Sequence, residues 1–126
     1  MRRHYLAHAI ETASPALRLT MLYDALELDL LRADNAFESG DLKSINDNLV
    51  HAQEIILCLR DTIQPERWEA ARQMIALHNF FLAELLGANL NKDRERAAAV
   101  AKLIGRIADA WRQAAETVAT TQEAVS

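Results

Sequence analysis

The stretch TASPALRLTMLYDALELDLL, residues 12–31, decides the fold class. Ser14 followed by Pro15 indicates a helix start, because Ser is a favoured N-cap and Pro sacrifices no hydrogen bond at the first helical position. The apolar residues that follow recur at helical spacing, and no segment of the chain alternates with the period of two that marks a strand. The stretch therefore predicts a long helix, which we expect to end at Ser39, before Gly40-Asp41.

The remainder of the chain predicts three more helices of similar length with short connections. We expect the second over Leu42–Thr62, the third from Gln64-Pro65-Glu66 to about Asn89-Leu90, and the fourth from the end of NKDRE to roughly Thr117. Short connections favour antiparallel neighbours. The predicted fold is thus all-α, an antiparallel up-down-up-down four-helix bundle. Residues 1–13 would form a short N-terminal helical or irregular segment packed against it, and residues 119–126 a frayed tail.

The composition fits one globular domain that spans residues 1–126, since 51% of the residues are hydrophobic and 25% are charged. The net charge of −4 argues against a nucleic acid or an anionic membrane as partner. No apolar run is long enough to span a bilayer, and the N-terminus lacks the apolar centre of a signal peptide. The single cysteine, Cys58, fits a reducing compartment and is expected to be buried. These features favour a cytoplasmic protein.

The first helix is apolar on two opposite sides. With about 100° per residue, one face lies within about 60° of Leu19 and contains Leu22, Tyr23, Leu26, Leu30 and Phe37. The opposite face, between about 120° and 200° from Leu19, contains Leu17, Met21, Leu28 and Leu31. On the second helix Val50 and Leu57 lie off the core face, and the third helix has a broad apolar arc that includes Leu77 and Phe81. We take these surplus positions as candidate partner-binding residues.

Two interpretations of the surplus stripe are open. In the first, the helix is simply central and is wrapped by the other elements of the same chain. In the second, the stripe forms a groove for another polypeptide, because contiguous apolar patches of more than a few hundred Å² usually mark interaction sites. That polypeptide is either a different protein or a second copy of this chain, for which the stripe would be the seam of a homodimer or larger homo-oligomer.

No motif indicates catalysis, a metal or a cofactor. His4 and His8 are spaced i, i+4, but no carboxylate or cysteine ligand accompanies them. His51 and His78 fall inside helices, where surface or hydrogen-bonded core roles are expected. The repeated Glu-x-x-His of di-iron bundles, the P-loop, GxGxxG, GxSxG and HExxH are all absent from the sequence. We therefore expect a protein that is not an enzyme.

Several segments, in order along the chain, resemble one known family. They are Tyr5-Leu6, Thr12-Ala13-Ser14-Pro15, Leu22-Tyr23-Asp24, the second-helix residues Ala52, Gln53, Ile55, Ile56 and Leu59, then Leu85, Leu86, Ala88-Asn89-Leu90, Asp93 and Ala110-Trp111. Together they resemble the flagellar secretion chaperone family, FliS. The chain departs from the family pattern at Ala9, at Ala25 and at Trp68-Glu69-Ala70-Ala71, where the family has Gln, Gly and Gly-Gly, and around His78-Asn79-Phe80-Phe81.

The resemblance implies a cytoplasmic chaperone that binds the disordered C-terminal region of flagellin, prevents its premature polymerisation and keeps it competent for export. Helical segments of flagellin would dock on the surplus apolar stripe. The resemblance also implies that the N-terminal segment shapes or covers a hydrophobic pocket, at the matching positions Tyr5 and Ile10. Export-gate components are a further class of partner that the sequence leaves open.

Overall fold

The computed structural model describes the backbone of residues 14–125 and the side chains of residues 14–118, 120 and 121. Its elements are four helices: α2 (Pro15–Ser39), α3 (Leu42–Thr62), α4 (Ala71–Asn91) and α5 (Arg94–Val125). The predicted all-α four-helix bundle is confirmed. The expectations for residues 1–13, including Tyr5, Ile10 and the His4–His8 pair, lie outside the described residues.

The first two helices begin and end where the sequence predicts, because their caps are formed by local side chains. The Ser14 side chain accepts a hydrogen bond from the Leu17 backbone N at 3.3 Å, and Pro15 is the first helical residue. Gly40 ends α2 with a left-handed φ of 70°, a conformation that costs glycine little. The Asp41 side chain then accepts from the Ser44 backbone N at 3.1 Å and caps α3.

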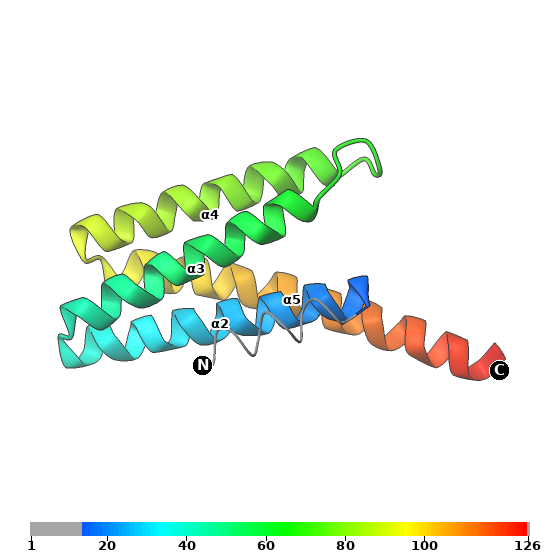
Figure 1. The fold of residues 1–126 in the computed structure, drawn as a ribbon, viewed down its shortest axis with the longest axis horizontal. Helices are drawn as coiled ribbons and strands as arrows, with labels where there is room; N and C mark the ends of the chain where they lie inside the picture. The colour runs from blue at the N-terminus through cyan, green and yellow to red at the C-terminus, as the bar shows by residue number, and fades with distance from the viewer. Residues whose placement is uncertain (1–13, 126) are drawn as a thin grey trace.

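The other two helices differ from the prediction. Helix α4 begins at Ala71, six residues after Pro65, because residues 64–71 form turns: the Gln64 carbonyl accepts from Arg67 N and the Trp68 carbonyl accepts from Ala71 N, each at 3.1 Å. Helix α5 has 32 residues and continues to Val125, so the segment expected to fray is helical. The helices therefore differ in length, and the last turns of α5 extend past the rest of the molecule (Figure 1).

The helices form a ring in which each packs against two neighbours. Helix α2 contacts α3 and α5, and α4 contacts the same two, so α2 and α4 occupy opposite corners of the bundle. The two-residue connections, Gly40-Asp41 and Lys92-Asp93, lie at one end of the molecule. Towards the other end, which carries the 63–70 connection, the α3–α4 pair diverges from the α2–α5 pair (Figure 1).

The core is apolar with a few polar groups built into it. Its fully buried large side chains include Leu26, Leu49, Ile56, Phe81, Leu85 and Ile104, and the predicted core residues Tyr23 and Leu30 are buried with them. Asp29, His78 and Asn89 are the buried polar residues of the described chain. Cys58 was expected in the core but is exposed. The neighbouring Leu59 is buried in the core, and successive side chains on a helix point about 100° apart, so Cys58 points away from the core. Among the described helices, none could cross a membrane.

Candidate partner-binding surface

The surplus apolar stripe of α2 lies outside the core, as the interpretation of a surface groove requires. Leu17 is 53% exposed and Leu31 is 57% exposed, while Met21 and Leu28 are half-buried. Covering such exposed leucine side chains with another surface is favourable, and complete burial of one leucine from full exposure contributes roughly 1.5–3 kcal/mol. The structure therefore leaves α2 with apolar surface that its own core does not consume.

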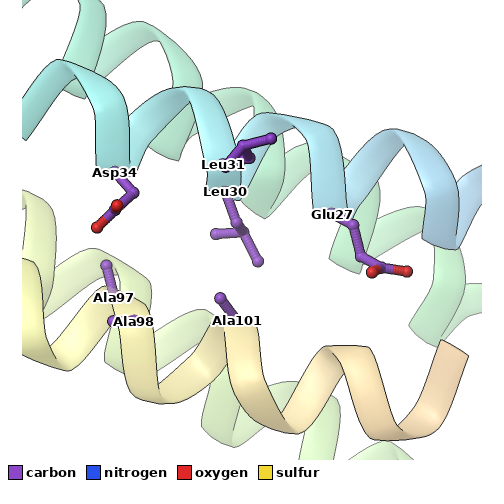
Figure 2. A pocket seen from close by; sticks show the side chains of 7 residues that line it. All are labelled: Glu27, Leu30, Leu31, Asp34, Ala97, Ala98 and Ala101. Carbon is purple, nitrogen blue, oxygen red and sulfur yellow. The ribbon is translucent and has the colours of Figure 1, made fainter. Parts of the chain in front are cut away.

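A cavity of about 300 Å³ opens between α2 and α5 beside Leu31 (Figure 2). It is lined by Glu27, Leu30, Leu31 and Asp34 of α2 and by Ala97, Ala98 and Ala101 of α5. Figure 2 shows Leu30 reaching from α2 towards Ala101, while the three alanines present only methyl groups. Because α5 has small side chains along this edge, the space between the two helices stays open instead of being filled.

A larger cavity, of about 740 Å³, lies on the same pair of helices near the start of α2. It is lined by Ser14, Pro15, Ala16, Leu17 and Thr20 of α2 and by Arg112, Ala115, Glu116 and Val118 of α5. Since the two helices run antiparallel, the first turns of α2 face the later turns of α5, and Leu30 faces Ala101 further along. We call the two cavities and the seam that joins them the α2–α5 groove.

An ion-pair cluster crosses the groove between the two cavities. The Arg112 guanidinium donates to Asp24, to Glu27 and, at 2.9 Å, to Asp109. The hydrogen bonds to Asp24 and Glu27 raise the pKa of Arg112 further above its usual value. A second arginine, Arg94, donates to Asp34 at 2.9 Å and to Glu38 beyond the cavity at Leu31, and it lowers the pKa of Asp34. These pairs tie α5 to α2 across an otherwise apolar seam.

A second apolar surface follows the seam between α3 and α4. Two hydrogen bonds mark this seam: Asn89 to Asn46 at 2.9 Å and Arg60 to Asn79 at 2.8 Å. The exposed apolar side chains that lie between them at spacings of three, four or seven residues are Val50, Leu57 and Leu86, exposed by 40%, 39% and 51%. Val50 and Leu57 are thus at the surface as predicted, and each is exposed far enough to contact another chain.

The outer side of α4 adds apolar residues that the sequence reasoning missed. Phe80 is 49% exposed and Leu90 is 74% exposed. The signal for them is that α4 is apolar all the way round, which is unusual for a helix with a solvent-facing side. Once the structure shows that Leu85 is buried, helical spacing places Phe80 and Leu90 on the outward side.

Of the two candidate residues on α4, one is buried and the other is half-buried. Phe81 is fully buried, with its ring 5.6 Å from that of His78, so its assignment to a partner-binding surface is wrong. The reason is helical spacing: Phe81 shares the inward face with Leu85 and Ala88, four and seven residues on. Leu77 is half-buried and packs against the core.

The two histidines of the described chain make structural contacts. The His51 Nδ1 contacts the buried Asp29 carboxylate across the α2–α3 interface. His78 lies in the core between Tyr23 and the Met74 carbonyl. Within residues 14–121, no group of His, Cys, Asp and Glu side chains has an arrangement that could hold a metal ion.

Comparisons with known proteins support the resemblance seen in the sequence. A family model described as "Flagellar protein FliS" matches residues 1–118. The flagellar secretion chaperone FliS of Bacillus subtilis (strain 168) is 30% identical over 113 residues, which cover 90% of this chain and 84% of that protein. The flagellar secretion chaperone FliS of Salmonella typhimurium is 33% identical over 107 residues, covering 83% of this chain and 79% of that protein.

Proposed function

Since this chain belongs to the FliS family of flagellar secretion chaperones, we propose that it binds the disordered C-terminal region of flagellin in its apolar surface grooves. Binding there would prevent premature polymerisation and keep the subunit competent for export from the cytoplasm. Membership of this family also confirms that the chain is a chaperone and not an enzyme. The single observation that carries the proposal is the α2–α5 groove, with Leu17 and Leu31 exposed at its two cavities.

The groove suits a helix that folds as it binds. An amphipathic helix laid between two helices buries apolar side chains at spacings of three, four and seven residues. The apolar stripe of α2, made of Leu17, Met21, Leu28 and Leu31, has the same spacings. Leu17 and Leu31 are each a little more than half exposed, so covering both could contribute roughly 1.5–3 kcal/mol in total. Ordering a disordered segment costs about 2–5 kcal/mol or more, so the groove alone supports weak binding.

Tight binding therefore requires the partner to cover more than one surface. The α3–α4 seam, with Val50, Leu57 and Leu86, is the next apolar surface available to it, and Phe80 and Leu90 extend this surface over α4. A flexible segment of flagellin can wrap over both, because disordered partners spread their contacts over large areas. The proposed roles of Tyr5 and Ile10, as a cover of the groove in the absence of flagellin, and of export-gate components as further partners stay predictions.

Titration calorimetry with a C-terminal flagellin fragment tests the proposal. We expect saturable binding with a negative change in heat capacity, the mark of apolar burial. Leu31→Asp should weaken binding at least tenfold, because it places a charge in the groove. Leu42→Asp is the matched control: Leu42 is 62% exposed but lies at the start of α3, away from the α2–α5 groove.

Two results would contradict the proposal. One is the absence of a complex between the wild-type protein and the fragment at tens of micromolar. The other is a stable homodimer, seen by light scattering, that Leu17→Asp and Leu31→Asp both dissociate, since the stripe would then be a self-association seam. Helical circular dichroism of each variant shows that the bundle is intact before binding is measured.

A further inference from the structure

The two cavities of the α2–α5 groove lie at a fixed distance from each other along one line of α2. Leu17 lines the first and Leu31 the second, and the two residues are fourteen apart in sequence. Fourteen residues correspond to nearly four helical turns, so the two leucines project from the same side of α2 about 21 Å apart. A helix that lies along the groove rises at the same rate and meets both cavities with residues about fourteen positions apart.

The midpoint of the groove is polar. Asp24 lies seven residues after Leu17 and seven before Leu31, and it shares the Arg112 guanidinium with Glu27 and Asp109. Three carboxylates thus surround one guanidinium, and Asp24 and Asp109 remain largely exposed, at 56% and 69% of their side-chain surface. A helix lying in the groove would cover this cluster with its middle turn, where a cation or an uncharged hydrogen-bond donor is favoured over a carboxylate.

Negative charge is concentrated along the whole groove. The acidic residues that line its cavities or pair with the arginines there are six in number: Asp24, Glu27, Asp34, Glu38, Asp109 and Glu116. The basic residues of the same set are Arg94 and Arg112. The rest of the sequence then holds twelve of its fourteen basic residues and twelve of its eighteen acidic residues. The net charge of the chain, −4, is therefore equal to the formal excess on this groove.

The wall that α5 contributes allows the backbone of a partner to approach closely. Ala98 and Ala101 end in methyl groups, and Gly105 follows at helical spacing on the same side. A Cβ atom at Gly105 would have no neighbour within 4 Å, so this middle part of the wall is also open. An occupant can therefore lie against α5 over several turns while its larger side chains enter the cavities at Leu17 and Leu31.

From this juxtaposition we propose that the α2–α5 groove binds one amphipathic helix with apolar side chains about fourteen residues apart and a basic or amide residue midway between them. The proposal rests on the proposed function, in which that helix is a segment of flagellin, and it specifies the chemistry of the segment that this groove selects. The acidic rim attracts a helix whose apolar side is flanked by lysine or arginine, and it disfavours one flanked by carboxylates.

Binding of synthetic peptides to the full-length protein tests this inference. The first peptide is an amphipathic helix of about 18 residues with leucines fourteen positions apart and lysine midway. The second differs only by glutamate at the midpoint. We expect the lysine peptide to bind at least tenfold more tightly than the glutamate peptide, and this difference should shrink as the salt concentration rises.

A matched pair of protein variants locates the binding. Ala98→Leu fills the cavity beside Leu31, whereas Ala99→Leu makes the same change at an exposed position of α5 that does not line the cavity. We expect Ala98→Leu to lower the affinity for the lysine peptide at least tenfold and Ala99→Leu to leave that affinity unchanged. Both variants should have the melting temperature of the wild type. Equal affinities for the two peptides, or equal affinities of the two variants, would overturn the inference.

A parallel titration with the C-terminal flagellin fragment separates this inference from the proposed function. If the fragment binds the wild type and Ala98→Leu equally well, flagellin uses another surface, so the inference fails while the proposed function stands. If the lysine peptide binds as expected but the fragment does not bind at all, the proposed function fails while the selectivity of the groove stands. A homodimer that Ala98→Leu dissociates would mean that a second copy occupies the groove, which overturns the inference.

Discussion

The Tyr23 hydroxyl on α2 lies 3.0 Å from Nε2 of His78 on α4, and this hydrogen bond joins helices at opposite corners of the bundle. His78 Nδ1 lies 2.8 Å from the Met74 carbonyl, which can only accept, so Nδ1 carries the proton. Nε2 of the neutral ring is then the acceptor and Tyr23 the donor. Burial raises the pKa of Tyr23 to about 12 although a hydrogen bond with Trp111 opposes the shift, so this residue also reaches α5.

The first prediction concerns the dependence of stability on pH. Burial lowers the pKa of His78 below its usual value, and the hydrogen bond to Met74 only partly opposes this. Below about pH 6.5 the unfolded chain therefore binds more protons at this site than the folded chain, so the His78 contribution to stability falls as the pH decreases towards the folded-state pKa. We expect the urea unfolding midpoint of the wild type to decrease more than that of His78→Phe when the pH is lowered from 7.5 to 5.5.

A constant difference between those midpoints over this range would contradict the prediction. His51→Gln serves as the control variant, because it removes a histidine at the α2–α3 interface and leaves the Tyr23–His78 contact in place.

The second prediction concerns the Tyr23 hydroxyl itself. Tyr23→Phe keeps the ring in the core but leaves Nε2 of the buried His78 without its donor. A buried acceptor without a partner costs about 1–3 kcal/mol, so the free energy of unfolding should fall by that amount at pH 7.5. Chemical denaturation measures the loss, and a change of less than a few tenths of a kcal/mol would show that water or another group replaces the hydroxyl.

The third prediction compares two adjacent phenylalanines. Phe81 is fully buried and Phe80 is 49% exposed, so Phe81→Ala should reduce the free energy of unfolding by about 3–5 kcal/mol and Phe80→Ala by about 1 kcal/mol or less. The two variants are matched in chemistry and helix position. Similar losses of stability from both, measured by urea unfolding, would show that the inward face of α4 is assigned wrongly.

The fourth prediction compares two glycines. Gly105 lies inside α5 with open space where a Cβ would be, so Gly105→Ala should stabilise the protein by about 0.5–1 kcal/mol through helix propensity. Gly40 has a φ of 70° at the end of α2, and Gly40→Ala should destabilise the protein by about 1 kcal/mol because alanine is strained there. Thermal melts of the two variants should therefore shift in opposite directions.

The sequence was sufficient for features that depend on local chemistry. Ser14, Pro15, Gly40 and Asp41 predicted the junctions of α2 and α3 because each acts on the backbone next to it. The structure also agrees with the two-sided pattern of α2, since Leu17 and Leu31 are exposed while Tyr23, Leu26 and Leu30 are buried in the core. Helical spacing alone carries that information.

Features that depend on three-dimensional packing were not predictable in the same way. Pro65 and its acidic neighbour resemble a helix start, but the residues around them form turns, in which the Gln64 and Trp68 carbonyls accept from Arg67 N and Ala71 N. On α4 almost every face is apolar, so the sequence alone does not separate its inward side, which carries Phe81, from its outward side, which carries Phe80. The contact between Tyr23 and His78 joins residues 55 positions apart, and no local pattern indicates it.

The two-residue connections, Gly40-Asp41 and Lys92-Asp93, lie at the same end of the bundle, where Arg94 also joins α5 to α2 and Asn89 joins α4 to α3. The opposite end has one long connection and diverging helix pairs. Amide hydrogen exchange should consequently be graded along the long axis, slow in the last turns of α2 and α4, residues 36–39 and 85–91, and faster towards residue 63 and the start of α2. We expect local opening to begin at the end with the long connection, while the two short connections at the other end keep the helices joined in pairs.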